Sequence, residues 1–90
     1  MNLPFVHYKI IKESKRANGH EIYLIEMQDC RMFSLLHVFE NEVQESRCYI
    51  YSTDQKFKKI VLANARKDFN QWKENSYHRD EYLGEPITNE

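Results

Sequence analysis

The segment STDQKFKKIVLANARKDFNQWKE, residues 52–74, decides the fold. Ser52 with Gln55 fits a capping box, which satisfies the first backbone N–H groups of a helix. After it, apolar side chains recur about every 3.6 residues and fall on one side of a helical wheel. They are Phe57, Val61, Leu62, Ala65, Phe69 and Trp72. The pattern predicts one amphipathic helix over residues 53–74, which at about 1.5 Å per residue is long enough to lie across a small sheet.

Upstream of this helix the apolar period changes to two, which is typical of strands. We expect four strands, over residues 5–12, 21–27, 31–39 and 47–51. Asn18-Gly19 favours a hairpin turn between the first two, because both residues tolerate positive φ. We also expect a tight turn over residues 28–30 and a polar, acidic loop over residues 40–46.

The order β-β-β-β-α predicts an α+β fold, in which a four-stranded antiparallel meander is followed by one long helix packed on one sheet face. We expect a single domain over residues 1–75 and a short, polar, acidic and partly disordered C-terminal tail over residues 76–90. The predicted core consists of Val6, Ile10, Ile22, Leu24, Phe33, Leu35, Ile50, Phe57, Val61, Ala65, Phe69 and Trp72. Both faces of the third strand are largely apolar, so the face away from the helix needs a cover: the tail, a second copy or another protein.

Length and composition narrow the class of protein. Ninety residues make one small domain. No apolar run approaches the roughly 18–20 residues that span a bilayer, and the N-terminus lacks the basic and apolar regions of a secretory signal. We therefore expect a cytoplasmic protein with no membrane partner. Cys30 and Cys48 are too few for a disulfide scaffold, so we expect two reduced, partly buried thiols.

Basic residues are concentrated on the predicted helix, although the net charge of the chain is −1. Five of them fall broadly opposite the apolar stripe: Lys56, Lys59, Arg66, Lys67 and Lys73. One interpretation is a solvated face that keeps the protein soluble. The other is a face that binds nucleic-acid phosphates or an acidic protein surface.

Tyrosines offer a second candidate surface. Tyr49 and Tyr51 lie two residues apart and therefore share one face of the fourth strand. They either pack within the sheet or form an exposed aromatic platform, which could stack bases or anchor a protein interface. Tyr77 and Tyr82 could extend such an interface from the tail.

The chain shows no catalytic or metal-binding pattern. It lacks the Cys and His spacings of zinc sites and has no glycine-rich phosphate loop. We interpret His7 and His37 as core or edge residues of strands, and we expect His20 to be exposed on a turn. The sequence therefore predicts a non-catalytic protein without a cofactor or metal.

Three functional hypotheses follow. The first is a small protein-binding module, a regulator or inhibitor of a larger machine, of the kind common among phage and mobile-element proteins such as anti-CRISPR inhibitors. The alternative is a nucleic-acid-binding protein that uses the basic outer face of the helix. The third, compatible with both, is a homodimer formed through a sheet edge or the uncovered face.

Overall fold

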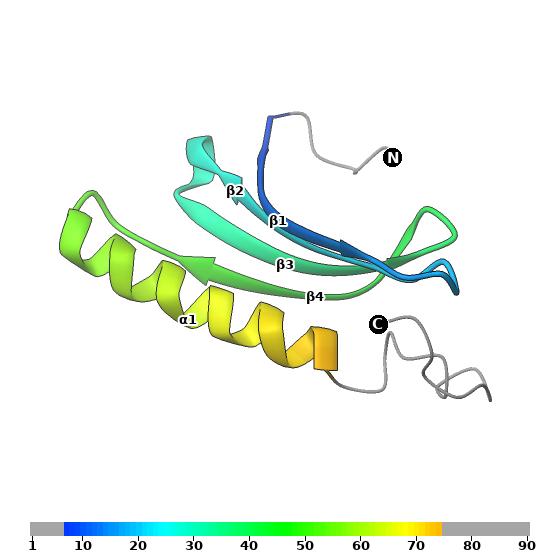
Figure 1. The fold of residues 1–90 in the computed structure, drawn as a ribbon. Helices are drawn as coiled ribbons and strands as arrows, with labels where there is room; N and C mark the ends of the chain where they lie inside the picture. The colour runs from blue at the N-terminus through cyan, green and yellow to red at the C-terminus, as the bar shows by residue number, and fades with distance from the viewer. Residues whose placement is uncertain (1–6, 75–90) are drawn as a thin grey trace.

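The computed structural model describes residues 7–74, which form one four-stranded antiparallel sheet and one long helix. The elements are β1 (Lys9–Lys15), β2 (Glu21–Met27), the 3₁₀ turn η1 (Gln28–Cys30), β3 (Met32–Phe39), β4 (Glu42–Ile50) and α1 (Gln55–Glu74). The strands lie in the order β1-β2-β3-β4, and α1 runs along one face of the sheet (Figure 1). This confirms the predicted α+β fold. Val6, Tyr77, Tyr82 and the predicted tail lie outside the described residues.

The start of α1 is fixed by Asp54. Its Oδ1 atom accepts a hydrogen bond from the Lys56 N–H at 2.9 Å, and its carbonyl accepts the first bond of the helix, from the Lys58 N–H. Asp54 is therefore the N-cap residue. The predicted capping box on Ser52 is wrong by two residues, because the Ser52 hydroxyl instead accepts from the Asp54 N–H at 3.2 Å. The predicted helix is otherwise confirmed up to Glu74.

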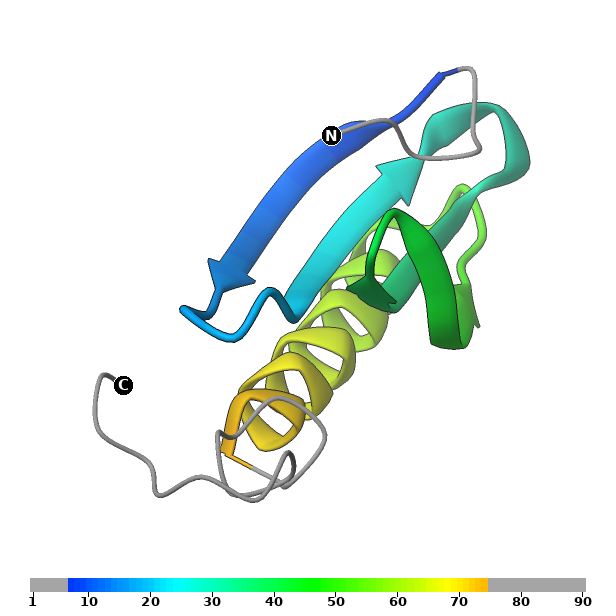
Figure 2. The same ribbon diagram turned by 90° about the vertical axis from the view of Figure 1, so that its right-hand side faces the viewer.

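The main core lies between α1 and the sheet. Its buried members are Ile22, Leu24, Phe33, Leu35, Tyr51, Ala65, Phe69 and Trp72. Seven of these were predicted from the alternation of the strands and the stripe of the helix, and Val61 packs against them half-buried. Tyr51 was not in the predicted core. Figure 2 looks along the helix and shows the strands bending over it.

Three predicted core residues are exposed instead: Ile10, Ile50 and Phe57. A register irregularity between Ile10 and Lys12 places Ile10 opposite Ile25 on the far face of the sheet. Ile50 lies opposite Met32 at the end of an edge strand. Phe57 belongs to the first turn of α1 and is 45% exposed.

The hairpin between β3 and β4 corrects the predicted loop over residues 40–46. Phe39 pairs with Glu42, so Glu40 and Asn41 alone form the turn. Both have positive φ, 53° and 63°, as a two-residue type I′ turn requires. The sequence carries no Asn-Gly or Asp-Gly signal here, which is why β4 was predicted to start at residue 47 instead of Glu42.

The hairpin between β1 and β2 turns at the predicted Asn18-Gly19. Gly19 has a φ of 92°, and its N–H donates to the Arg16 carbonyl at 3.0 Å. The Arg16 side chain donates in turn to the backbone carbonyl of Lys73 in the last turn of α1. An arginine at this position stabilises the carbonyl end of a helix. β1 extends to Lys15, three residues beyond the predicted first strand.

The face of the sheet away from α1 has a second apolar cluster. Tyr23, Ile25, Leu36 and Val38 are buried there, and Met27 packs against them half-buried. The alternation of β2 and β3 predicted apolar side chains on this face, and these four are at most 2% exposed.

Candidate interaction surfaces

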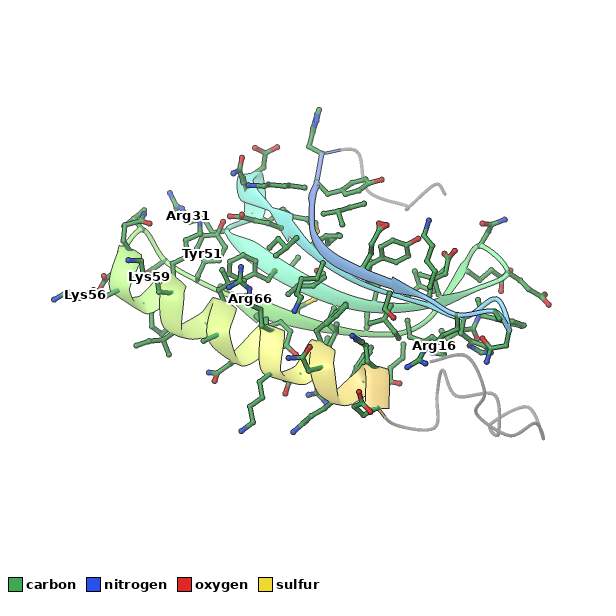
Figure 3. The ribbon with its side chains drawn as sticks, in the orientation of Figure 1. Arg16, Arg31, Tyr51, Lys56, Lys59 and Arg66 are labelled. Atoms are coloured by element: carbon green, nitrogen blue, oxygen red, sulfur yellow. The ribbon has the colours of Figure 1, made fainter. Side chains whose placement is uncertain are left out.

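Four of the five predicted basic residues on the helix are exposed, namely Lys56, Lys59, Arg66 and Lys67, and Lys73 is half-buried. Lys56 and Lys59 lie in the first turns of α1, at the same end of the molecule as Arg31, and Arg66 lies midway along it (Figure 3). These residues do not form one face. Lys56 and Lys67 point away from the sheet, as their wheel positions opposite the buried Ala65 and Trp72 require.

The other three basic residues form a line toward β1. Lys59, Arg66 and Lys73 are each seven residues apart, which is close to two helical turns, so they share one side of α1. The Nζ atom of Lys73 lies 6.0 Å from the centre of the Phe69 ring, and Nζ of Lys12 in β1 lies 5.3 Å from the same ring. We call Lys12, Lys59, Arg66 and Lys73 the basic flank. Lys12 was not among the predicted site residues, because its position beside the helix depends on the register of β1.

The opposite side of α1 faces β4 and carries Asp68, the one acidic residue of α1 that is not at its C-terminal end. Asp68 accepts hydrogen bonds from Arg47 at 3.1 Å and from the Tyr49 hydroxyl at 2.6 Å. Burial and the bond to Asp68 raise the pKa of Tyr49. The bond to Asp68 likewise raises the pKa of Arg47. Charge is therefore segregated across the helix, with paired residues toward β4 and cations toward β1.

Tyr51 lies in a second polar contact beneath the sheet. Its hydroxyl donates to the buried Glu26 carboxylate at 2.5 Å, and the Lys58 ammonium lies 2.9 Å from the same carboxylate oxygen and over the Tyr51 ring. Burial raises the pKa of Glu26, but the hydrogen bonds from Tyr51 and Lys58 outweigh it and leave the pKa below its ordinary value. Tyr51 is buried and Tyr49 half-buried, both toward α1. The exposed-platform interpretation of this pair is therefore wrong, and the sheet-packing interpretation holds.

Large apolar side chains are exposed on the β4 side of the molecule. Ile50 is 72% exposed, Ile60 is 60% exposed and Phe57 is 45% exposed. Phe57 lies eleven residues before Asp68, three helical turns, so it shares the side that Asp68 turns to β4. Ile60 is its neighbour at i+3. We call Phe57 and Ile60 the apolar patch. Ile50 lies opposite Met32, so its side chain is exposed on the other face of the sheet, away from α1. Ile60 falls outside the predicted apolar stripe of the helix. Its position on the helical wheel therefore indicated, from the sequence alone, an apolar side chain that faces water.

Two histidines that the sequence placed apart are joined in the structure. His20 is buried, which corrects the prediction that it is exposed. Its Nδ1 atom lies 2.7 Å from Nε2 of His37. His37 lies within β3, as predicted, and is buried. His7 is exposed and precedes β1, which corrects its predicted place in a strand.

The two cysteines are not joined by a disulfide, and the potential metal ligands of the described segment do not cluster. Cys30 and Cys48 are both free thiols, and both are exposed, which corrects the expected partial burial. Between residues 7 and 74, no three side chains of the His, Cys, Asp or Glu types come together as metal ligands do.

Two depressions are lined by described residues, and both are open to solvent. The larger, of about 690 Å³, follows the outer side of α1 and is lined by Ala63, Arg66, Lys67, Asn70, Gln71 and Glu74. The smaller, of about 270 Å³, is lined by His7, Tyr8, Lys9, Glu26, Gln28 and Asp29. Neither set of lining residues includes a nucleophile in hydrogen-bonding contact with a base.

Comparison with known proteins gives no relative: no family model, no curated protein and no solved structure matches the chain. The helix of the described segment is not apolar enough to cross a bilayer.

Proposed function

We propose that this chain is a non-catalytic protein-binding module, a regulator or inhibitor of a larger assembly, whose partner docks on the β4 side. The observation that carries the proposal is the exposure of the apolar patch, Phe57 and Ile60, on α1 and of Ile50 at the end of β4, all outside the core between α1 and the sheet. Each Å² of apolar area that a partner removes from water contributes about 25 cal/mol to the free energy of binding. A contiguous exposed apolar patch therefore often marks an interaction site. The link to phage or mobile-element proteins stays a prediction from size and composition.

Site-specific photo-crosslinking tests this proposal. A photoreactive phenylalanine analogue in place of Ile60 should give covalent adducts in cells, whereas the same analogue in place of Arg66, on the basic flank, should not. The adduct is then identified by mass spectrometry and its protein is purified. Ile60→Asp should weaken binding of that protein about tenfold or more, a change of about 1.4 kcal/mol, while Arg66→Asp leaves it unchanged. Adducts from neither position, or equally from both, would overturn the proposal.

The basic flank favours nucleic-acid binding as a second candidate function. Of the two acids that α1 carries, Asp68 lies on the β4 side and is paired with Arg47, and Glu74 is the last residue of the helix. The line from Lys59 to Lys73 therefore presents cations without an acid among them. Phosphate contacts of this kind supply affinity that falls steeply with salt.

Titration of labelled single- and double-stranded DNA and RNA, at low and at physiological salt, tests this candidate. The double variant Lys59→Glu/Arg66→Glu should abolish binding. A matched control, Lys56→Glu/Lys67→Glu, changes the net charge equally but lies away from β1, and it should keep most of the affinity. Equal losses in both variants would show that net charge matters and the basic flank does not. No binding at low salt would remove the candidate.

A further inference from the structure

Strand β4 is an open edge of the sheet. It is the last strand in the order β1-β2-β3-β4, and seven of its nine residues are exposed. An edge strand presents backbone N–H and C=O groups that can pair with another strand. The charged residues Glu42 and Glu45 lie in its first half, while the second half ends at the exposed Ile50.

The register shows which backbone groups of β4 point outward. The Tyr51 N–H donates to the Arg31 carbonyl at 2.9 Å. Hydrogen-bonded and non-bonded pairs alternate along an antiparallel ladder, so the pairs Phe33–Tyr49 and Leu35–Arg47 are also bonded pairs. The N–H and C=O groups of the residues between them therefore point away from β3; they are Ser46, Cys48 and Ile50. A register shift at His37/Val38 leaves Gln44 as an extra residue in β4, so the regular run is 45–50.

We propose that a second copy of this chain pairs antiparallel with β4, with Cys48 on the two-fold axis, so that the two four-stranded sheets join into one. This inference rests on the proposed function, because it assigns one occupant, a second copy, to the backbone edge of the same β4 side. Cys48 then exchanges two backbone hydrogen bonds with the partner's Cys48, and Ser46 does so with the partner's Ile50 at each end. The paired run stays within the regular part of the strand.

Charge and ladder length favour this register. An axis at Glu45 or at Arg47 would place like charges directly opposite each other, which destabilises a strand pair. An axis at Ser46 would reach the irregularity at Gln44 after two residues. With the axis at Cys48, Arg47 lies opposite the partner's Tyr49, a cation beside an aromatic ring.

The same arrangement covers Ile50. Ile50, the most exposed of the large apolar residues, would pair with the partner's Ser46 and lie beside the partner's Cys48. The two-fold axis places both helices on the same face of the joined sheet, with the Phe57 side of each helix turned toward the other. A second copy thus accounts for the open edge of β4 and for the exposure of Ile50.

Mass and crosslinking together test the proposal. Light scattering on the purified chain should give twice 11.0 kDa at high concentration. In the Cys30→Ser variant, added diamide should produce a covalent dimer, because the Cα atoms of a bonded pair lie about 5.5 Å apart, within disulfide range. The two Cys48 thiols lose two protons and two electrons to diamide, and one S–S bond forms. Cys30→Ser/Cys48→Ser should give no covalent dimer.

A proline variant separates strand pairing from other modes of association. Ser46→Pro removes an outward N–H and leaves the ladder with β3 intact, so it should be a folded monomer by circular dichroism and light scattering. Ser46→Thr keeps the N–H and should remain a dimer. A monomeric wild-type chain, or a dimer that survives Ser46→Pro, overturns this inference. If the chain is monomeric but Ile60 still crosslinks to another protein, the proposed function stands and only the pairing of two copies at β4 is wrong.

Discussion

The Nδ1 atom of His20 lies 2.7 Å from the Nε2 atom of His37, and this bond ties the β1–β2 loop to the central strand β3. Both rings are buried, and the His20 ring also stacks on Phe39 with ring centres 4.2 Å apart. A neutral pair can share one proton, with one ring donating and the other accepting. Burial, and then the like charge of His20, lower the pKa of His37 to about 4; burial also lowers the pKa of His20.

This pair should make the protein less stable in mild acid. Because the pKa of His37 is lower in the folded chain than its ordinary value of 6.5, the unfolded chain binds the proton more readily as the pH falls below 6.5. The contribution of His37 to the free energy of unfolding should therefore be largest above pH 6.5 and should decrease as the pH falls toward 4. For His37 alone the loss at pH 5 is about 2 kcal/mol, measurable as a lower urea midpoint than at pH 7.

The control for this effect is His37→Phe, which removes the titrating ring from the pair. Glu45 lies opposite His37 in the register and Arg16 lies in the same loop as His20, so their charges are present in both proteins. The variant should show a smaller difference in stability between pH 7 and pH 5 than the wild type. An unchanged difference would mean that another group is responsible.

A substitution in the β3–β4 turn should stabilise the protein. Glu40 has a φ of 53°, and the left-handed region costs most L-residues roughly 1–2 kcal/mol, less for asparagine. Glu40→Asn should therefore raise the free energy of unfolding by about 0.5–1 kcal/mol, measured by urea denaturation. Glu42→Asn makes the same chemical change at the first residue of β4, where asparagine is disfavoured. It should not stabilise the protein, and a gain from both changes would point to charge as the cause.

The sequence predicted those parts of the fold whose signals are local. The helix follows from its stripe and from capping residues close to Gln55, and Asn18-Gly19 sets the first hairpin. One of the three misplaced core residues, Ile10, lies where the parity of a strand shifts. The irregularities near Ile10 and at Gln44 each move the following side chains to the other face, and no residue type announces them.

The candidate surfaces were harder to predict, because they depend on contacts between distant residues. The burial of Tyr49 and Tyr51 depends on Asp68 and Glu26, which accept hydrogen bonds from the two hydroxyl groups and are distant in sequence. The basic residues were identified correctly by type. Their division into an outer group and a flank beside β1 required the position of α1 on the sheet.

The N-cap gives a direct contrast between the predicted and the observed helix start. Asp54→Ala removes the side chain that accepts the Lys56 N–H and should cost about 1 kcal/mol of stability. Ser52→Ala removes only a bond to the Asp54 N–H, before the helix begins, and should cost less. Thermal unfolding of the two variants measures the order. A larger loss for Ser52→Ala would restore the capping box on Ser52 and Gln55.

The buried carboxylate of Glu26 should make the Tyr51 hydroxyl more valuable than that of Tyr49. Tyr51→Phe leaves the ring in the core but removes a hydrogen bond to a carboxylate that is almost inaccessible to water. Bonds to buried charged groups contribute about 1.5–3 kcal/mol, so a loss of about 2 kcal/mol in the free energy of unfolding is expected. Tyr49→Phe removes the same atom from a bond to Asp68, whose side chain is 22% exposed and also held by Arg47. Water and Arg47 can replace the hydroxyl there, so urea denaturation should show a loss below about 1 kcal/mol. Equal losses in the two variants would mean that Lys58 alone satisfies Glu26 and that the Tyr51 hydroxyl adds nothing to the core.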